Sequence, residues 1–189
     1  MNIEPSSCEI HTHIDAPSSW VLRFADQVAA AGRVLDVACG AGRHARLFAQ
    51  RGHHVDAVDR DIEALREASR SFPGITAIQA DIEAGPWPFP GAHYDAVVVT
   101  NYLHRPLFPA LLAAVEPGGL LIYETFALGN ERYGRPARAE FLLKPGELLN
   151  VVHGQFEVLA YESGYVDTPK PAMIQRIAAR RILPPATQR

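Results

Sequence analysis

The chain has 189 residues, of which 48% are hydrophobic and 21% are charged, and its formal net charge is −3. This composition is typical of one globular domain and excludes a collagen-like or disordered chain. No apolar run approaches the ~20 residues that cross a bilayer, and polar residues interrupt the first thirty positions, so we expect neither a membrane span nor a signal peptide. The expected location is therefore cytoplasmic.

Cysteine content and charge narrow the classes of partner. Cys8 and Cys39 are too few for a disulfide framework or a zinc cluster. The small acidic excess argues against a general electrostatic grip on nucleic acid, and the basic stretch Lys170–Arg189 is the one feature that favours RNA. We expect a small-molecule substrate, no nucleic acid and no membrane, and the sequence leaves the oligomeric state open.

The N-terminal region divides into an irregular part and a helix. Residues 1–16 have no apolar periodicity and predict an irregular arm. After Pro17, apolar residues recur every four positions and predict a helix with Ser18 or Ser19 as its N-cap and Gly32 at its end.

Residues 33–125 alternate between short β-branched apolar segments and segments of helical periodicity. The expected strands are Arg33–Ala38, His54–Val58, Ile75–Gln79, Tyr94–Thr100 and Leu120–Thr125. The expected helices are Arg43–Arg51, Ile62–Phe72 and Arg105–Val115. This alternation predicts an α/β, doubly wound fold, in which a parallel sheet carries helices on both faces.

The C-terminal third has a different pattern. Phe156–Glu162 and Ala172–Ile182 read as two strands without a helix between them, which predicts an antiparallel pair. We expect one domain over residues 17–182, with residues 127–144 as a candidate lid insertion and residues 183–189 as a tail.

In an open α/β sheet, ligands bind beyond the carboxyl ends of the strands. The first predicted strand leads into the turn Ala38–Gly42, whose glycines permit sharp bends and close approach of a ligand, and a helix with unpaired N–H groups follows. Such a turn is weak evidence by itself, because folds that bind NAD, FAD and S-adenosylmethionine all use it.

Carboxylates at the ends of four predicted strands make the site more specific. Asp36 is placed to attract an ammonium or sulfonium group, Asp59 to accept hydrogen bonds from a ribose diol, and Asp81 to bind an adenine amino group beside Ile82. Glu124 follows the fifth strand. Taken singly, an acidic residue after a strand is more often a helix cap. Together they favour a positively charged nucleoside and disfavour a diphosphate.

Five segments in this order resemble the motif set of the class I S-adenosylmethionine-dependent methyltransferases: VLDVACGAGRHA, VDAVDRD, QADIE, YDAVVVTNYLHR and EPGGLLIYETF. The small bacterial tellurite-resistance-type methyltransferases are the most similar members. The resemblance implies a Rossmann-like seven-stranded sheet, mostly parallel, with the last strand antiparallel. It also implies S-adenosyl-L-methionine as cofactor and methyl transfer to a small acceptor by in-line displacement.

Carried over by position, the resemblance implies a set of cofactor-binding residues. They are Asp36, Ala38, Gly40, Gly42, Asp59, Arg60, Asp81, Ile82 and Asn101. Ala38 stands where many members have glycine, and its methyl group is a small obstacle.

Three residues are candidates for catalysis: His104, Tyr102 and Glu124. An imidazole near neutrality can accept a proton, so His104 is a candidate base, with helix capping as the alternative. No metal site is expected, because the histidines lack a carboxylate or cysteine at ligand spacing.

The candidate lid contains Arg135 and Arg138, and a guanidinium matches a carboxylate or phosphate, so we also consider an anionic acceptor. The alternative is a solvated loop. Two other functions remain open, namely a catalytically silent S-adenosylmethionine-binding module that acts through a partner and an NAD-dependent Rossmann oxidoreductase, which Asp36 disfavours.

Overall fold

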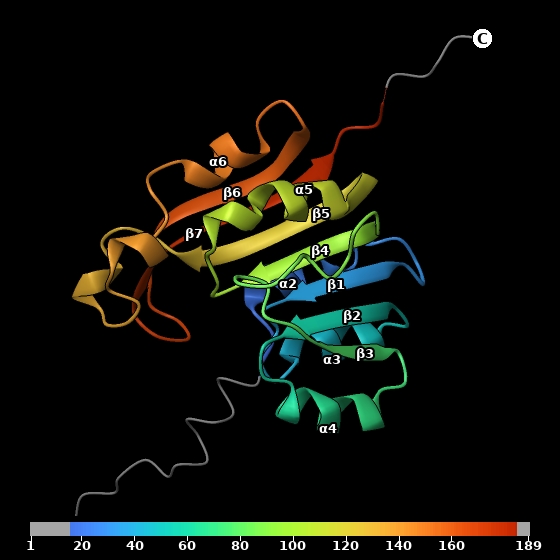
Figure 1. The fold of residues 1–189 in the computed structure, drawn as a ribbon. Coiled ribbons are helices and arrows are strands. Elements are labelled where there is room, and N and C mark those ends of the chain that lie inside the picture. The colour runs from blue at the N-terminus through green and yellow to red at the C-terminus, as the bar shows by residue number, and fades with distance from the viewer. Residues whose placement is uncertain (1–15, 185–189) are drawn as a thin grey trace, which may run out of the picture.

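The computed structural model describes residues 16–184, so residues 1–15 of the predicted arm and residues 185–189 of the predicted tail lie outside it. The described chain forms one seven-stranded sheet with helices on both faces (Figure 1). Within this range, no helix has the length and apolar character needed to cross a membrane.

The sheet has the strand order β3-β2-β1-β4-β5-β7-β6. The strands are β1 (Arg33–Val37), β2 (His54–Asp59), β3 (Ile75–Gln79), β4 (Tyr94–Thr100), β5 (Val115–Phe126), β6 (Phe156–Val166) and β7 (Ala172–Arg181). The first five pair in parallel, and β7 pairs antiparallel with both β5 and β6. The predicted doubly wound fold and its antiparallel last strand are confirmed.

Within residues 16–184, five α-helices cover the sheet. They are α2 (Ser19–Ala25), α3 (Arg43–Gln50), α4 (Glu63–Ser71), α5 (Phe108–Ala114) and α6 (Glu147–Val152). Helices α2, α3 and α4 pack on one face, and α5 and α6 on the other (Figure 1). Each face of the sheet has a hydrophobic core, and the central strands contribute side chains to both. Leu35 and Val37 of β1 belong to one core, and Val34 belongs to the other. Burial on both faces explains why these strands are continuous apolar runs.

Several boundaries differ from the predicted ones, and β6 ends at Val166 instead of Glu162. The first helix ends at Ala25 because the next amides bond to the carbonyls three residues back, which tightens the chain into a turn before Gly32. Strand β5 begins at Val115, five residues before the predicted start, because it continues through residues 117–119 with a register shift against β4. The predicted helix Arg105–Val115 is a 3₁₀ turn followed by α5, with a proline near the start of each.

The turn between β1 and α3 holds three residues in the left-handed region. The φ angles are +52° at Ala38, +54° at Gly40 and +76° at Gly42. Gly42 has a second constraint, because an added Cβ would lie 2.5 Å from Leu65 Cδ1. Alanine adopts this conformation at a cost of roughly 1–2 kcal/mol, so Ala38 carries backbone strain in addition to the methyl group noted in the sequence.

Asp36 lies beneath this turn and is 1% exposed. Its Oδ2 accepts a hydrogen bond from the Ala45 N–H in the first turn of α3, at 3.0 Å. Burial raises the pKa of this carboxyl to about 7. The carboxylate therefore links β1 to α3 at a position that favours its protonated form.

We predict that Ala38→Gly raises the free energy of unfolding by about 0.5–1 kcal/mol, because relief of the left-handed strain outweighs the added flexibility of the unfolded chain. Urea denaturation measures the change. Ala41→Gly in the same turn is the matched control: Ala41 does not have a positive φ, so this variant should be less stable than wild type. Equal destabilisation by both substitutions would contradict the strain at Ala38.

We also predict that Asp36→Asn removes a pH dependence of stability. The folded-state pKa lies above the unfolded one, so the folded protein binds the extra proton and loses stability as pH rises from about 4 to about 7. The stability of Asp36→Asn relative to wild type should grow by up to ~1.4 kcal/mol per pH unit over this range and then level off. Denaturation at several pH values tests it, with the exposed Asp26→Asn as control, and a constant difference would show that Asp36 is not the titrating group.

Candidate functional site

The candidate site lies at the carboxyl ends of the parallel strands, where the strand order reverses. Strand β1 lies between β2 and β4, so successive crossovers leave it in opposite directions and open a crevice between the connecting loops. Three adjoining cavities occupy this edge of the sheet. We call them the β2–β3 cavity, the turn cavity and the hairpin cavity.

The β2–β3 cavity has a volume of about 250 Å³. Its lining consists of Ala38, Asp59, Arg60, Ala80, Asp81, Ile82, Glu83 and Tyr102. The turn cavity, of about 270 Å³, is lined by Ala38, Cys39, Gly40, Ala41, Arg43, Thr100, Asn101 and Tyr102. Because the two cavities share Ala38 and Tyr102, they form neighbouring parts of one crevice.

The hairpin cavity is the largest, at about 310 Å³. It lies between the segment that begins α2, the end of β5 and the loop that joins β6 to β7. It shares Arg43 and Asn101 with the turn cavity, so the three cavities form a row. A ligand in the β2–β3 and turn cavities would therefore lie beside any molecule that occupies the hairpin cavity.

The acidic residues after β2 and β3 have the geometry of hydrogen-bond acceptors. Asp59 Oδ2 accepts from the Gly40 N–H at 2.8 Å, which ties the end of β2 to the turn after β1. Asp81 Oδ1 accepts from the N–H groups of Ala84 and Glu83, and these bonds hold the pKa of the Asp81 carboxyl below its usual value. An ionised carboxylate beside the buried Ile82 suits a nucleoside with hydroxyl and amino donors.

Two observations indicate that the crevice has room for a ligand and a polar group that could bind it. A Cβ built on Gly40 meets no atom within 4 Å, so the backbone there is open to the turn cavity. The Tyr102 hydroxyl is buried and has no hydrogen-bond partner within residues 16–184. Burial and the nearby Glu83 carboxylate raise the pKa of Tyr102, so it stays a donor at neutral pH. The residues present thus fit a polar, nucleoside-sized group.

The structure brings most of the predicted site residues together at this edge, and three lie elsewhere. Asp36 and Gly42 support the turn from below and line none of the three cavities. His104 also lines none of them, and its Nδ1 lies 3.9 Å from Glu83 Oε2. Of the three candidate catalytic residues, Glu124 lines the hairpin cavity, whereas Tyr102 lines the two other cavities.

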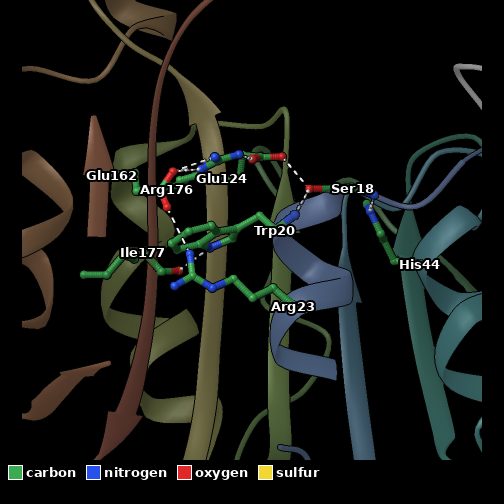
Figure 2. Close-up of polar contacts among 8 residues, drawn as sticks. All are labelled: Ser18, Trp20, Arg23, His44, Glu124, Glu162, Arg176 and Ile177. Carbon is green, nitrogen blue, oxygen red and sulfur yellow. Dashed lines mark hydrogen bonds and ion pairs between the residues drawn. The ribbon is translucent and has the colours of Figure 1, made fainter. Parts of the chain in front are cut away.

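Glu124 is held at the wall of the hairpin cavity by two partners (Figure 2). Its Oε1 accepts from the Ser18 hydroxyl at 2.7 Å, and its Oε2 lies 3.1 Å from Arg176 Nη1. Arg176 also binds Glu162, which in turn pairs with Arg23. The carboxylate therefore has a fixed position. It is one of two carboxylates in a chain of ion pairs that also contains two arginines.

Ser18, at the start of α2, connects this helix to Glu124 of β5 and to His44 of α3 (Figure 2). Its side chain caps α2 by accepting from the Trp20 N–H, and its own N–H donates to His44 Nε2 at 3.1 Å. Burial lowers the pKa of His44 to about 3, so this imidazole is neutral and can accept the bond. Trp20 is buried, bonds to the Ile177 carbonyl and supports the Arg176 guanidinium on its ring.

The candidate lid, residues 127–144, is fastened to the body of the protein. Arg105 binds both oxygens of Glu147 and the carbonyls of Glu140 and Leu142. No residue of 127–144 lines any of the three cavities, and Arg138 pairs with Glu140. The hairpin loop, instead of this segment, forms the wall of the hairpin cavity.

Sequence reasoning missed the functional residues of the C-terminal hairpin. Arg176 of β7 lies directly opposite Glu124 of β5 and Glu162 of β6 in the sheet register. A register for the antiparallel strands would have revealed this cross-strand set, since opposite charges favour such positions. The strands and their antiparallel pairing with each other were predicted, but their register and the pairing of β7 with β5 were not.

Comparison with known proteins agrees with this geometry. Residues 34–119 match the family model described as a methyltransferase domain. The chain is 36% identical over 102 residues to trans-aconitate 2-methyltransferase of Paracidovorax citrulli, a match that covers 50% of this chain and 38% of that relative. The chain thus spans well under half the length of this curated relative.

Two solved structures are similar in fold. TehB from Haemophilus influenzae gives a TM-score of 0.73 at 20% identity, covering 87% of this chain and 62% of that chain. A TehB-like S-adenosylmethionine-dependent methyltransferase from Corynebacterium glutamicum gives 0.65 at 16% identity, covering 92% and 94%. Residues 34–119 therefore match a methyltransferase-domain family, and the fold of the chain is similar to that of TehB and of the TehB-like methyltransferase.

Proposed function

We propose that the chain is an S-adenosylmethionine-dependent methyltransferase that acts on a small anionic acceptor. The observation that carries the proposal is the row of three cavities at the carboxyl ends of the strands. Two of them are lined by the carboxylates and the glycine turn that suit the cofactor, and the third adjoins them with a separate lining. A transferase needs this arrangement, because two reactants must lie side by side.

The cofactor would be held by the turn and by the ends of β2 and β3. Asp59 would accept hydrogen bonds from the ribose hydroxyls, and Asp81 from the adenine amino group, with Ile82 against the ring. Gly40 and Asn101 would border the amino-acid portion in the turn cavity. When bound, S-adenosylmethionine supplies a methyl group on a sulfonium, with a neutral thioether as the leaving group.

The chain's own contribution to the reaction is binding and orientation. The hairpin cavity would hold the acceptor beside Asn101 and Arg43, which border both cavities. Glu124, fixed by Ser18 and Arg176, would orient a donor group of the acceptor or receive its proton. Much of the rate enhancement would come from holding two reactants in contact.

An anionic acceptor is supported by two observations. Arg43, Lys170 and Arg176 line the hairpin cavity, and Glu124 is the one acidic residue among the described residues of its lining. One curated relative acts on trans-aconitate, which is a tricarboxylate. Cationic side chains in a cavity of this kind favour carboxylates and other anions.

Two rivals make different predictions for binding and turnover. An NAD-dependent oxidoreductase would bind NAD, with its diphosphate at the glycine turn after β1. A catalytically silent module would bind S-adenosylmethionine without transferring a methyl group. Titration calorimetry with S-adenosylhomocysteine and with NAD distinguishes the methyltransferase from the oxidoreductase. Release of S-adenosylhomocysteine in the presence of a pooled metabolite library distinguishes the methyltransferase from the silent module.

We predict that Asp59→Ala weakens S-adenosylhomocysteine binding by ~1–3 kcal/mol, because the charged acceptor of the ribose hydroxyls is lost. Calorimetry measures the affinity, and the exposed Asp26→Ala should bind like wild type. Asp59→Asn keeps an acceptor for the Gly40 N–H and separates collapse of the turn from loss of the ligand contact. Unchanged affinity in Asp59→Ala would remove Asp59 from the cofactor site.

A further inference from the structure

The floor of the hairpin cavity is a small hydrophobic cluster separate from the two cores of the sheet. Phe126, Ala172 and Ile174 line the cavity and pack with the buried Leu142 and the partly buried Val166. Neither main core includes these residues. The cavity therefore offers an apolar surface to its occupant at the end farthest from the glycine turn.

The acidic and basic side chains of the adjoining wall neutralise one another. Arg176 binds Glu124 and Glu162, and Glu162 also binds Arg23 (Figure 2). Two carboxylates thus balance two guanidinium groups, and the Arg176 side chain is 19% exposed. An acceptor that bound Arg176 in place of Glu124 would break the ion pair between them, which is costly for a mostly buried carboxylate. Arg176 is therefore a positioning residue for Glu124.

Lys170 differs from Arg176 in this respect. It lies in the loop between β6 and β7, lines the cavity and is exposed, and its Nζ is 5.6 Å from the centre of the Phe126 ring. It makes no ion pair with any carboxylate of residues 16–184. Its ammonium group thus lies over the Phe126 ring of the apolar floor, with no carboxylate of the described residues to balance its charge.

We propose that the hairpin cavity takes an amphipathic organic anion, whose apolar body lies on the floor formed by Phe126, Ala172 and Ile174 and whose carboxylate or similar group binds Lys170. Lys170 is then a specificity-determining residue. That this anion is the methyl acceptor rests on the proposed function, whereas its binding does not.

The cavity volume favours an organic occupant over an inorganic oxyanion. About 310 Å³ is at the lower end of the range for pockets that hold organic ligands. A small oxyanion would leave the apolar floor uncovered and would gain nothing from burying it. An apolar body covers the floor, and the ammonium group then sets the sign of the charge that the ligand carries.

A pair of fluorescent probes tests the proposal on the full-length protein. The anionic probe is 8-anilinonaphthalene-1-sulfonate, and N-phenyl-1-naphthylamine has the same aromatic body without the sulfonate. Lys170→Gln should weaken binding of the anionic probe about three- to fivefold, as expected for a partly exposed ion pair. Binding of the neutral probe should be unchanged. Lys170→Arg should restore binding of the anionic probe.

The chain supplies a matched control, because Lys144 is its one other lysine and lies outside the cavity. Lys144→Gln should bind both probes like wild type. Val166→Trp, which fills the floor, should weaken both. Hexanoate should displace the anionic probe at concentrations at which selenite does not.

The proposal is overturned if Lys170→Gln does not change binding of the anionic probe, or if it weakens binding of both probes equally. It is also overturned if selenite displaces the anionic probe at the same concentrations as hexanoate. Calorimetry with S-adenosylhomocysteine on the same samples keeps the two conclusions separate. Absence of cofactor binding would defeat the proposed function without changing the probe result. Cofactor binding together with an unaffected anionic probe would defeat the Lys170 proposal alone.

Discussion

The reversal of strand order beside β1 is the constraint on which the site depends. Right-handed crossovers to either side of β1 draw the connecting segments apart, and the carboxyl ends of β1 and β4 are left open between them. The chain leaves both ends in the left-handed conformation, with φ of +52° at Ala38 and +56° at Asn101. Non-glycine residues in this region are strained, and Ala38 and Asn101 both border the turn cavity, whereas Ala31, the third such residue among those described, lies before β1.

The parallel half of the fold was predictable because its signals are local. Each strand from β1 to β4 is a short apolar run, and the acidic residue after a strand needs no knowledge of distant partners. For this reason Asp59, Asp81 and Asn101 were placed at the correct edge of the sheet. Burial was harder to predict: Asp36 alternates with Leu35 and Val37 along β1, yet it points beneath α3 and not toward the crevice.

The contacts around the hairpin cavity were harder to predict because they are not local. Ser18 and Glu124 are 106 positions apart, and Arg176 reaches Glu124 across 52. No periodicity in the sequence specifies which residue of β7 lies opposite Glu124, since a shift of one residue would turn every side chain to the other face. The same holds for residues 127–144: their arginines were visible in the sequence, but the hydrogen bonds from Arg105 to the carbonyls of Glu140 and Leu142 were not.

The two halves of the site therefore carry different kinds of information. The family match ends at residue 119, whereas Phe126, Lys170 and Arg176 of the hairpin cavity all follow it. Similarity in residues 34–119 bears on the nucleotide side of the crevice and leaves the acceptor undetermined. Because β7 inserts between β5 and β6, a change in the hairpin loop alters the cavity wall without disturbing the glycine turn. A fold built in this way can keep one cofactor and vary its acceptor, so specificity has to be argued from the hairpin itself.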